Sequence, residues 1–311
     1  MSQFSLPKEF VENQIEVFGR EATEDWIARL PGLIQDAASR WDLEIGPALP
    51  ELYFNYLCHA KRRAAVDSAS EEVILKAGLA VDELKGEIET LRVWSQRGDG
   101  ASAQLLDSDA ANGILLLERL RPGQMLASLT DDERATEIAA DLLARLWSPV
   151  TDSTPFIQLK DWFRGLDSLR PRFSGGTGPF PPRLLETAEG LIRDLFADDS
   201  PPTLLHGDYH HYNILSHGAA WRVIDPKGVV GPREYDLGPF MLNPCFSPRP
   251  NLKEESARRL DIFTERLGLD RQRIWAWSVA HSVLSAWWNM EKDGTGGELA
   301  IACGEVFLEL G

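Results

Sequence analysis

The sequence has few cysteines and no long apolar runs. Its 311 residues include three cysteines, Cys58, Cys245 and Cys303, which lie far apart and form no Cys-x-x-Cys pair. A disulfide framework or a cysteine-based zinc site is therefore not expected. No run approaches the roughly 20 apolar residues of a membrane span, and the first residues hold no apolar leader segment. We expect a cytoplasmic protein that does not use a membrane.

Positive charge is also scarce. Lysine and arginine number 32 against 48 aspartates and glutamates, so the formal net charge is −16. Such a chain repels a phosphate backbone, and no nucleic-acid partner is expected. It would attract cationic small molecules. The alternative is that the charge serves only to keep the protein soluble.

Length and apolar spacing predict two lobes, since a domain averages roughly 150 residues. Residues 1–120 open with two helices in 7–39, with Gly19 and Pro31-Gly32 as breaks. They then give the order strand, strand, strand, helix, strand, strand, with the helix at 81–97. This order predicts a small antiparallel-sheet lobe with one main helix.

The remaining residues, 121–311, read as a larger and mostly helical lobe. The expected helices lie at 131–146, 182–197, 254–267 and 271–291, and the stretch 149–182 reads as a loop interrupted by a short helix. The predicted fold class is therefore α+β.

One segment carries the chemistry. His206, Gly207 and Asp208 begin an H-G-D-x-x-x-x-N pattern that ends at Asn213, and Asp225 follows twelve residues later at the end of a short apolar run. An aspartate can accept a proton from a substrate hydroxyl, while amide and carboxylate oxygens suit Mg²⁺. Phosphoryl transfer requires this combination. The alternative is a plain turn, because Gly-Asp pairs are common in turns.

Two neighbours of this motif read as structural residues. Four histidines fall within twelve positions, but a zinc site needs three or four ligands, no cysteine is near, and only His206 and His210 have the spacing of a common helical ligand pair. We expect His206 to bind backbone atoms within the loop. Asp236 is expected to be a buried carboxylate that accepts backbone N–H groups of the same loop.

Together these residues carry a resemblance. The H-G-D-x-x-x-x-N loop followed by an aspartate at a strand end resembles the aminoglycoside phosphotransferase family, which has a protein-kinase-like two-lobed fold. The strings LLHGDYHHYNIL and WRVIDPKGVVGPREYDLG resemble the branch that contains streptomycin 6-phosphotransferases and hydroxyurea phosphotransferases. The resemblance runs, with gaps, from about residue 41 to the C-terminus.

The resemblance implies an activity. ATP and Mg²⁺ would be the cofactors, and the γ-phosphoryl group would move to a hydroxyl of a small molecule. A streptomycin-like aminoglycoside or hydroxyurea are the leading acceptors, and antibiotic resistance is the associated role. The alternatives are a kinase of an unrelated metabolite alcohol and a kinase-like binding protein without turnover. A monomer or weak homodimer is expected.

The resemblance also implies roles for the motif residues. Asp208 would be the catalytic base or hydroxyl orienter, and Asn213 and Asp225 would hold Mg²⁺. Lys76, on the third strand, would contact the α- and β-phosphates. Its charge would be held by Glu87 on the next helix, with Glu83, one turn earlier, as the alternative.

A backbone hinge at 118–121, which includes Glu118 and Leu120, would bind the adenine edge. The loop expected between the first two strands, 46–52, departs from the glycine-rich loop of protein kinases. No phosphorylation-switch motif follows Asp225, which favours a small-molecule acceptor.

The expected acceptor site lies near the last helices. Acidic side chains follow the Trp287-Trp288 pair, and aromatic faces with carboxylates suit a guanidinium or ammonium group. The alternative is that the tryptophans belong to the core and the acids to the solvated surface. The acids considered are Glu291, Asp293 and Glu298.

Overall fold

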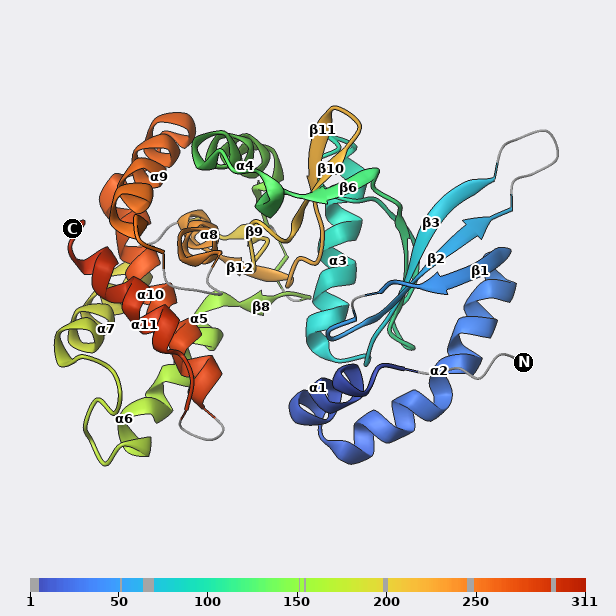
Figure 1. The fold of residues 1–311 in the computed structure, drawn as a ribbon, viewed down its shortest axis with the longest axis horizontal. Helices are drawn as coiled ribbons and strands as arrows, with labels where there is room; N and C mark the ends of the chain where they lie inside the picture. The colour runs from blue at the N-terminus through green and yellow to red at the C-terminus, as the bar shows by residue number, and fades with distance from the viewer. Residues whose placement is uncertain are drawn as a thin grey trace. The chain divides into compact units, whose positions relative to one another are not determined.

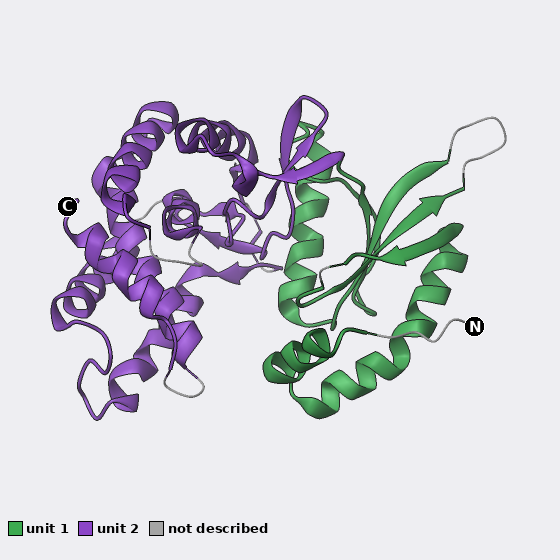
Figure 2. Ribbon diagram, viewed as in Figure 1, with its two compact units in different colours: residues 1–120 green, residues 121–311 purple. Residues whose placement is uncertain are grey.

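The computed structural model describes residues 6–50, 52–63, 70–150, 152–153, 155–197, 201–244, 249–291 and 295–311. These residues form two compact units, 1–120 and 121–311 (Figure 2). Cys58 and Cys303 are buried free thiols, while Cys245 and Asp293 lie outside the described residues. Within the described part, no helix is long and apolar enough to cross a bilayer.

The first unit is a five-stranded antiparallel sheet with three helices (Figure 1). The strand order in space is β1-β2-β3-β5-β4. Along the chain the order of strands and main helix is the predicted one. The elements are α1 (Lys8–Phe18), α2 (Arg20–Arg40), β1 (Leu43–Ala48), β2 (Tyr56–Arg62), β3 (Glu71–Ala77), α3 (Asp82–Arg97), β4 (Leu105–Asp109) and β5 (Ile114–Glu118).

Side chains alternate between the two faces of β3, and the two faces contact different helices. Val73 and Leu75 are fully buried and share one apolar core cluster with Leu30 of α2. Lys76 points to the other face, since successive strand residues alternate, and there it contacts Glu87 of α3. The central strand thus carries one buried cation on the face covered by α3.

Two expectations for this unit were wrong. Pro31 does not break the second helix, which continues through it to Arg40. A helix-interior proline costs about 3 kcal/mol, but Leu30 and Ile34 on either side are buried, and each burial contributes about 1.5–3 kcal/mol. The loop expected at 46–52 also begins too early, because β1 extends to Ala48.

The second unit is mostly helical. Its longer helices are α4 (Asp132–Leu146), α7 (Pro182–Ala197), α9 (Leu252–Leu267), α10 (Arg271–Met290) and α11 (Glu298–Leu308). Shorter helical segments are η1 (Leu126–Ser128), α5 (Leu159–Phe163), η2 (Arg164–Ser168), α6 (Leu169–Arg172), η3 (Arg233–Asp236) and α8 (Leu237–Leu242). Its α10 packs against α7, α8, α9 and α11, and Trp277 and Trp287 of α10 are buried.

Two small sheets hold the chemistry-bearing segment within this unit. One has the order β11-β10-β6 and the other β7-β9-β12-β8. The sequence did not indicate α11. It also did not indicate β7 and β8, because these two-residue strands depend on distant partners. The strands are β6 (Pro122–Met125), β7 (Ser148–Pro149), β8 (Ile157–Gln158), β9 (Thr203–Leu205), β10 (Ile214–His217), β11 (Ala220–Val223) and β12 (Val229–Gly231).

Candidate active site

Lys76 and Glu87 form a buried ion pair in the first unit. Lys76 Nζ lies 2.7 Å from Glu87 Oε1 and 2.8 Å from Oε2. The lysine side chain is 1% exposed and the glutamate side chain 7%. Of the two glutamates considered from the sequence, Glu87 is the one that holds the ammonium group in this bidentate contact. Because β3 lies between β2 and β5, Lys76 is not an edge-strand lysine.

The expected hinge residues lie at the end of β5. The Glu118 N–H donates to the Gln104 carbonyl at 3.0 Å, and Glu118 Oε2 accepts from the Gln104 N–H at 3.2 Å. Leu120 is buried and follows after the strand has ended. Hydrogen bonds to Gln104 therefore fix the end of β5. The chain leaves the sheet at the residues that are expected to bind adenine.

In the second unit, Asp236 anchors the start of the H-G-D loop. Its carboxylate accepts the His206 N–H at 3.1 Å, the Gly207 N–H at 2.8 Å and the Trp147 indole Nε1–H at 3.0 Å. Burial raises the pKa of Asp236 to about 6, and these three donors oppose the rise. The predicted structural role of Asp236 is confirmed, and Trp147 is a third donor that the sequence did not indicate.

Gly207 allows the loop to turn sharply over this carboxylate. Its φ of +81° is in the left-handed region that favours glycine. A Cβ there would lie 3.0 Å from Val229 Cγ2 and 3.1 Å from Lys227 Cβ. The glycine is therefore required by both conformation and space.

His206 is a neutral structural residue, as predicted. Its Nε2 lies 2.9 Å from the Ile224 carbonyl, and its Nδ1 accepts the Asp208 N–H at 3.3 Å. Because Nδ1 accepts, the proton lies on Nε2 and is donated to Ile224. Burial lowers the pKa of His206 to about 4, although the Asp208 charge opposes this.

Asp208 carries a negative charge that its neighbours stabilise. Its side chain is 39% exposed, and Oδ1 lies 3.3 Å from His210 Nε2. Burial alone would raise the pKa of Asp208. The neighbouring His210 and, to a smaller extent, Lys227 outweigh this effect and hold the pKa well below its ordinary value. The carboxylate is ionised at neutral pH and can accept a proton from a hydroxyl.

Asn213 and Asp225 lie at the same end of the β10–β11 hairpin. Ile214 pairs with Val223 across the hairpin, and the Ile224 N–H donates to the Asn213 carbonyl at 3.0 Å. Asp225, the next residue, has a left-handed φ of +57°. The Asn213 Nδ2 donates to the Asp208 carbonyl at 2.9 Å, and the amide oxygen Oδ1 is the atom of this side chain that could bind a metal. An amide oxygen beside a carboxylate fits Mg²⁺.

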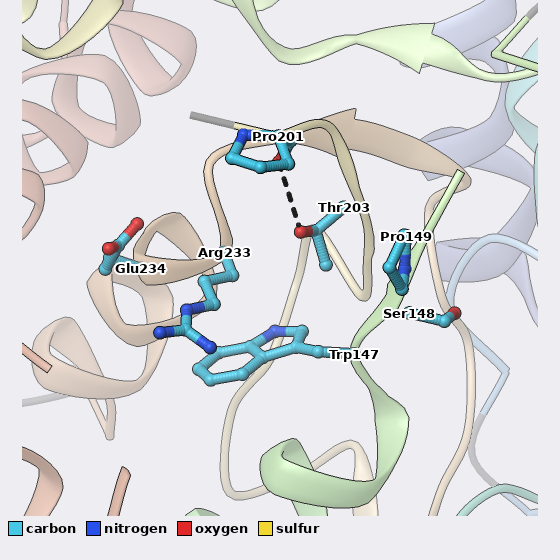
Figure 3. Close-up of a pocket in the computed structure, with 7 residues that line it drawn as sticks. All are labelled: Trp147, Ser148, Pro149, Pro201, Thr203, Arg233 and Glu234. Carbon is cyan, nitrogen blue, oxygen red and sulfur yellow. Dashed lines mark hydrogen bonds between the residues drawn. The ribbon is translucent and has the colours of Figure 1, made fainter. Parts of the chain in front are cut away.

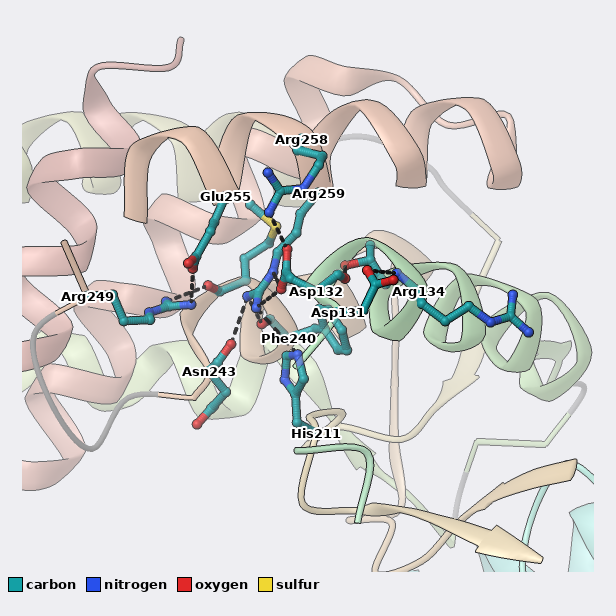
Figure 4. Close-up of polar contacts among 12 residues, drawn as sticks. Asp131, Asp132, Arg134, His211, Phe240, Asn243, Arg249, Glu255, Arg258 and Arg259 are labelled. Atoms are coloured by element: carbon teal, nitrogen blue, oxygen red, sulfur yellow. Dashed lines mark hydrogen bonds and ion pairs between the residues drawn. The ribbon is translucent and has the colours of Figure 1, made fainter. Parts of the chain in front are cut away.

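A buried arginine holds the other half of the loop. Arg259 of α9 donates to Asp132 Oδ1 at 2.9 Å through Nε and 2.6 Å through Nη2. The same Nη2 lies 3.4 Å from His211 Nε2, and Figure 4 shows these side chains converging. The His211 ring stacks on Phe240 with centroids 4.0 Å apart. The loop is therefore clamped at His206-Gly207 and again at His211.

An aromatic group surrounds His281 of α10 in the same unit. Burial lowers the pKa of His281 to about 4, and the Asp208 charge opposes this change. Trp288 is 42% exposed; its ring lies 6.3 Å from that of His281 and 5.4 Å from that of Trp162. The sequence pointed to both members of the tryptophan pair, and Trp288 is the exposed one.

Two of the three acids expected to bind the acceptor lie among the described residues, and both are on the surface. Glu291 and Glu298 are exposed, the first just after α10 and the second at the start of α11.

Comparison with known proteins settles the family. Residues 66–294, more than half of the chain, match the family described as aminoglycoside/hydroxyurea antibiotic resistance kinase. The chain belongs to this kinase family. The predicted family and small-molecule phosphotransferase activity are thus confirmed.

Relatives cover most of the chain. A hydroxyurea phosphotransferase of Kitasatospora aureofaciens is 31% identical and covers 97% of this chain and 84% of its own. A streptomycin 6-kinase of Streptomyces glaucescens is 29% identical and covers 93% and 92%.

Solved structures share the fold at low identity. A choline kinase from Streptococcus pneumoniae is 14% identical with a TM-score of 0.61, over 90% of this chain and 98% of that one. The aminoglycoside phosphotransferase APH(4)-Ia is 13% identical with a TM-score of 0.59, over 91% and 99%. The α+β, protein-kinase-like fold class is confirmed.

Trp147→Phe should destabilise the protein in a pH-dependent way. The folded pKa of Asp236, about 6, lies above its ordinary 3.8, so this group's contribution to stability declines as pH rises from 4 through 6. Removing a donor raises that pKa further. We expect the free energy of unfolding to fall by about 1.5–3 kcal/mol at pH 8 and by less at pH 5, measured by chemical denaturation.

Trp275→Phe is the matched control. Its Nε1 donates to the uncharged Phe307 carbonyl at 2.7 Å, so its loss should be equal at the two pH values. If Trp147→Phe lost the same unfolding free energy at both pH values, packing and not the hydrogen bond to Asp236 would explain the contribution of Trp147 to stability.

Lys76→Met should leave Glu87 buried without its lysine partner. Breaking a buried pair in this way costs about 3–5 kcal/mol, whereas replacing both members by apolar residues is close to neutral. The double variant Lys76→Met/Glu87→Leu should therefore recover wild-type unfolding free energy in urea. A double variant as unstable as the single one would contradict the pairing.

Proposed function

We propose that this kinase transfers the γ-phosphoryl group of ATP, with Mg²⁺, to a hydroxyl of a small molecule in the cytoplasm. The observation that carries the proposal is the doubly clamped loop that holds ionised Asp208 beside Asn213 and Asp225. Each of the three has an oxygen-bearing side chain, and backbone hydrogen bonds or hairpin pairing position the part of the chain that carries it. Such an arrangement suits a reaction in which positioning and charge stabilisation do most of the work.

The proposed roles follow from the contacts. Lys76, oriented by Glu87, contacts the α- and β-phosphates, and the backbone at Glu118 and Leu120 binds the adenine edge. Asn213 and Asp225 hold the metal, which when bound neutralises phosphate charge.

Asp208 orients the acceptor hydroxyl and receives its proton. The hydroxyl oxygen then forms a bond to the γ-phosphorus while the bond to ADP breaks.

The leading acceptors are a streptomycin-like aminoglycoside and hydroxyurea, the compounds in the names of the two relatives. They differ in charge, since streptomycin is a cation and hydroxyurea is neutral. The net charge of −16 and the exposed Trp288 beside His281 favour a cation, because aromatic faces attract guanidinium and ammonium groups. Trp288 is the proposed contact.

Asp208→Asn tests the catalytic assignment. We expect kcat to fall by a factor of about 10² or more, the scale of general-base and positioning effects, with the dissociation constant of ATP unchanged. Steady-state ADP release and calorimetric ATP titration measure the two quantities. Asp36→Asn, at an exposed position of α2, is the control that should retain full activity. An Asp208→Asn variant with near wild-type kcat would overturn the assignment.

Salt dependence tests the acceptor class. Streptomycin and hydroxyurea should be compared by ADP release at rising KCl. Exposed charges are screened over a Debye length of roughly 8–10 Å. The kcat/KM for streptomycin should therefore fall with salt while its kcat stays constant, and the values for hydroxyurea should stay flat. A flat kcat/KM for streptomycin would leave the acidic composition without a role in acceptor capture.

A further inference from the structure

The second unit contains a cavity that the phosphotransfer chemistry does not use. Its volume is about 440 Å³, within the range of small-molecule sites. Figure 3 shows its lining, which comes from the β7 segment, the start of β9 and η3. The lining residues are Trp147, Ser148, Pro149, Pro201, Thr203, Arg233 and Glu234.

The cavity adjoins the anchor of the catalytic loop, but its lining contains none of Asp208, Asn213 and Asp225. Pro149 of β7 pairs with Thr203, the first residue of β9, and β9 ends at Leu205 before the H-G-D segment begins. The three residues of β9, at about 3.3 Å per residue, lie between Thr203 of the lining and that segment. A ligand in the cavity would not occupy the place of the acceptor hydroxyl.

Arg233 offers the cavity an exposed cation. Its guanidinium carbon lies 5.7 Å from the centroid of the Trp147 ring. Among the residues that the structure describes, no carboxylate comes within ion-pair distance of Arg233. This sets it apart from arginines such as Arg170 and Arg266, which bind Glu189 and Glu137. The planar donor fork, held against the indole, matches a carboxylate.

The rest of the lining selects the body of the ligand. Glu234 is the acid nearest in sequence, but its Oε1 lies 3.3 Å from Arg273 Nε, which offsets its charge. The Thr203 hydroxyl donates to the Pro201 carbonyl at 3.4 Å. The remaining lining is Ser148, whose buried hydroxyl has no hydrogen-bond partner among the described residues, and the flat apolar surfaces of the Trp147 ring, Pro149 and Pro201. One anionic group on a flat apolar body fits this lining.

We propose that this cavity is a binding site for a small aryl carboxylate, with the carboxylate on Arg233 and the ring against Trp147 and the prolines. The site is independent of the phosphotransfer reaction. Its ligand contacts the residue that donates to Asp236, so the site adjoins the anchor of the catalytic loop.

The probe is 2-naphthoate, titrated into the intact protein by calorimetry and followed by saturation-transfer NMR. Wild type should bind it at least tenfold more tightly than the neutral 2-naphthamide. Arg233→Gln should weaken naphthoate binding at least tenfold. Arg172→Gln, at an exposed arginine of α6 outside the cavity, should leave the dissociation constant unchanged.

Two further measurements locate the probe. Asp208→Asn should bind naphthoate as wild type does, and saturating ADP should not displace it. Displacement by ADP, equal affinity of wild type and Arg233→Gln, or no binding to wild type at about 10 mM would each overturn the proposal. Circular dichroism melting of Arg233→Gln checks that the variant is folded. None of these outcomes depends on whether the proposed acceptor is correct.

Discussion

The carboxylate of Asp236 is the contact on which the catalytic loop depends. It gathers two backbone N–H groups and an indole N–H at one fully buried point. Burial resists the charge, and the three donors stabilise it. The backbone at Gly207 can turn over this point only because glycine tolerates its dihedral angles and leaves room for Val229 and Lys227. The ionised Asp208 follows directly from that turn.

Three buried or half-buried charges of the protein are each compensated in a different way. Lys76 has a bidentate partner on the neighbouring helix. Arg259 has Asp132 and two carbonyls, with the Phe240 ring beneath it. Asp208 is partly open to solvent and is balanced by His210 and Lys227. The first two contacts are closed within the protein, whereas the third leaves an oxygen that a substrate can reach.

Residues close in sequence could be predicted, and their distant partners could not. The H-G-D-x-x-x-x-N pattern is local, so Asp208, Asn213 and His206 could be identified, and the resemblance of the helix after Lys76 to that of the family brought Glu87 under consideration. Trp147 lies 89 residues from Asp236, and Arg259 lies 127 from Asp132. No periodicity links such positions. The two-residue strands β7 and β8 exist only because β9 and β12 pair with them, and Pro31 stays helical because packing on either side outweighs its local cost.

The clamp at both ends of the loop is built from groups that the folded chain always carries: a carboxylate, backbone amides, an indole, a guanidinium and an imidazole. A kinase whose loop is ordered by a phosphorylated side chain can be switched off by a phosphatase. The contacts described for this loop involve no such covalent mark, so folding alone orders it. The amount of ordered loop then depends on how much of the chain folds, and no second enzyme is needed to order it.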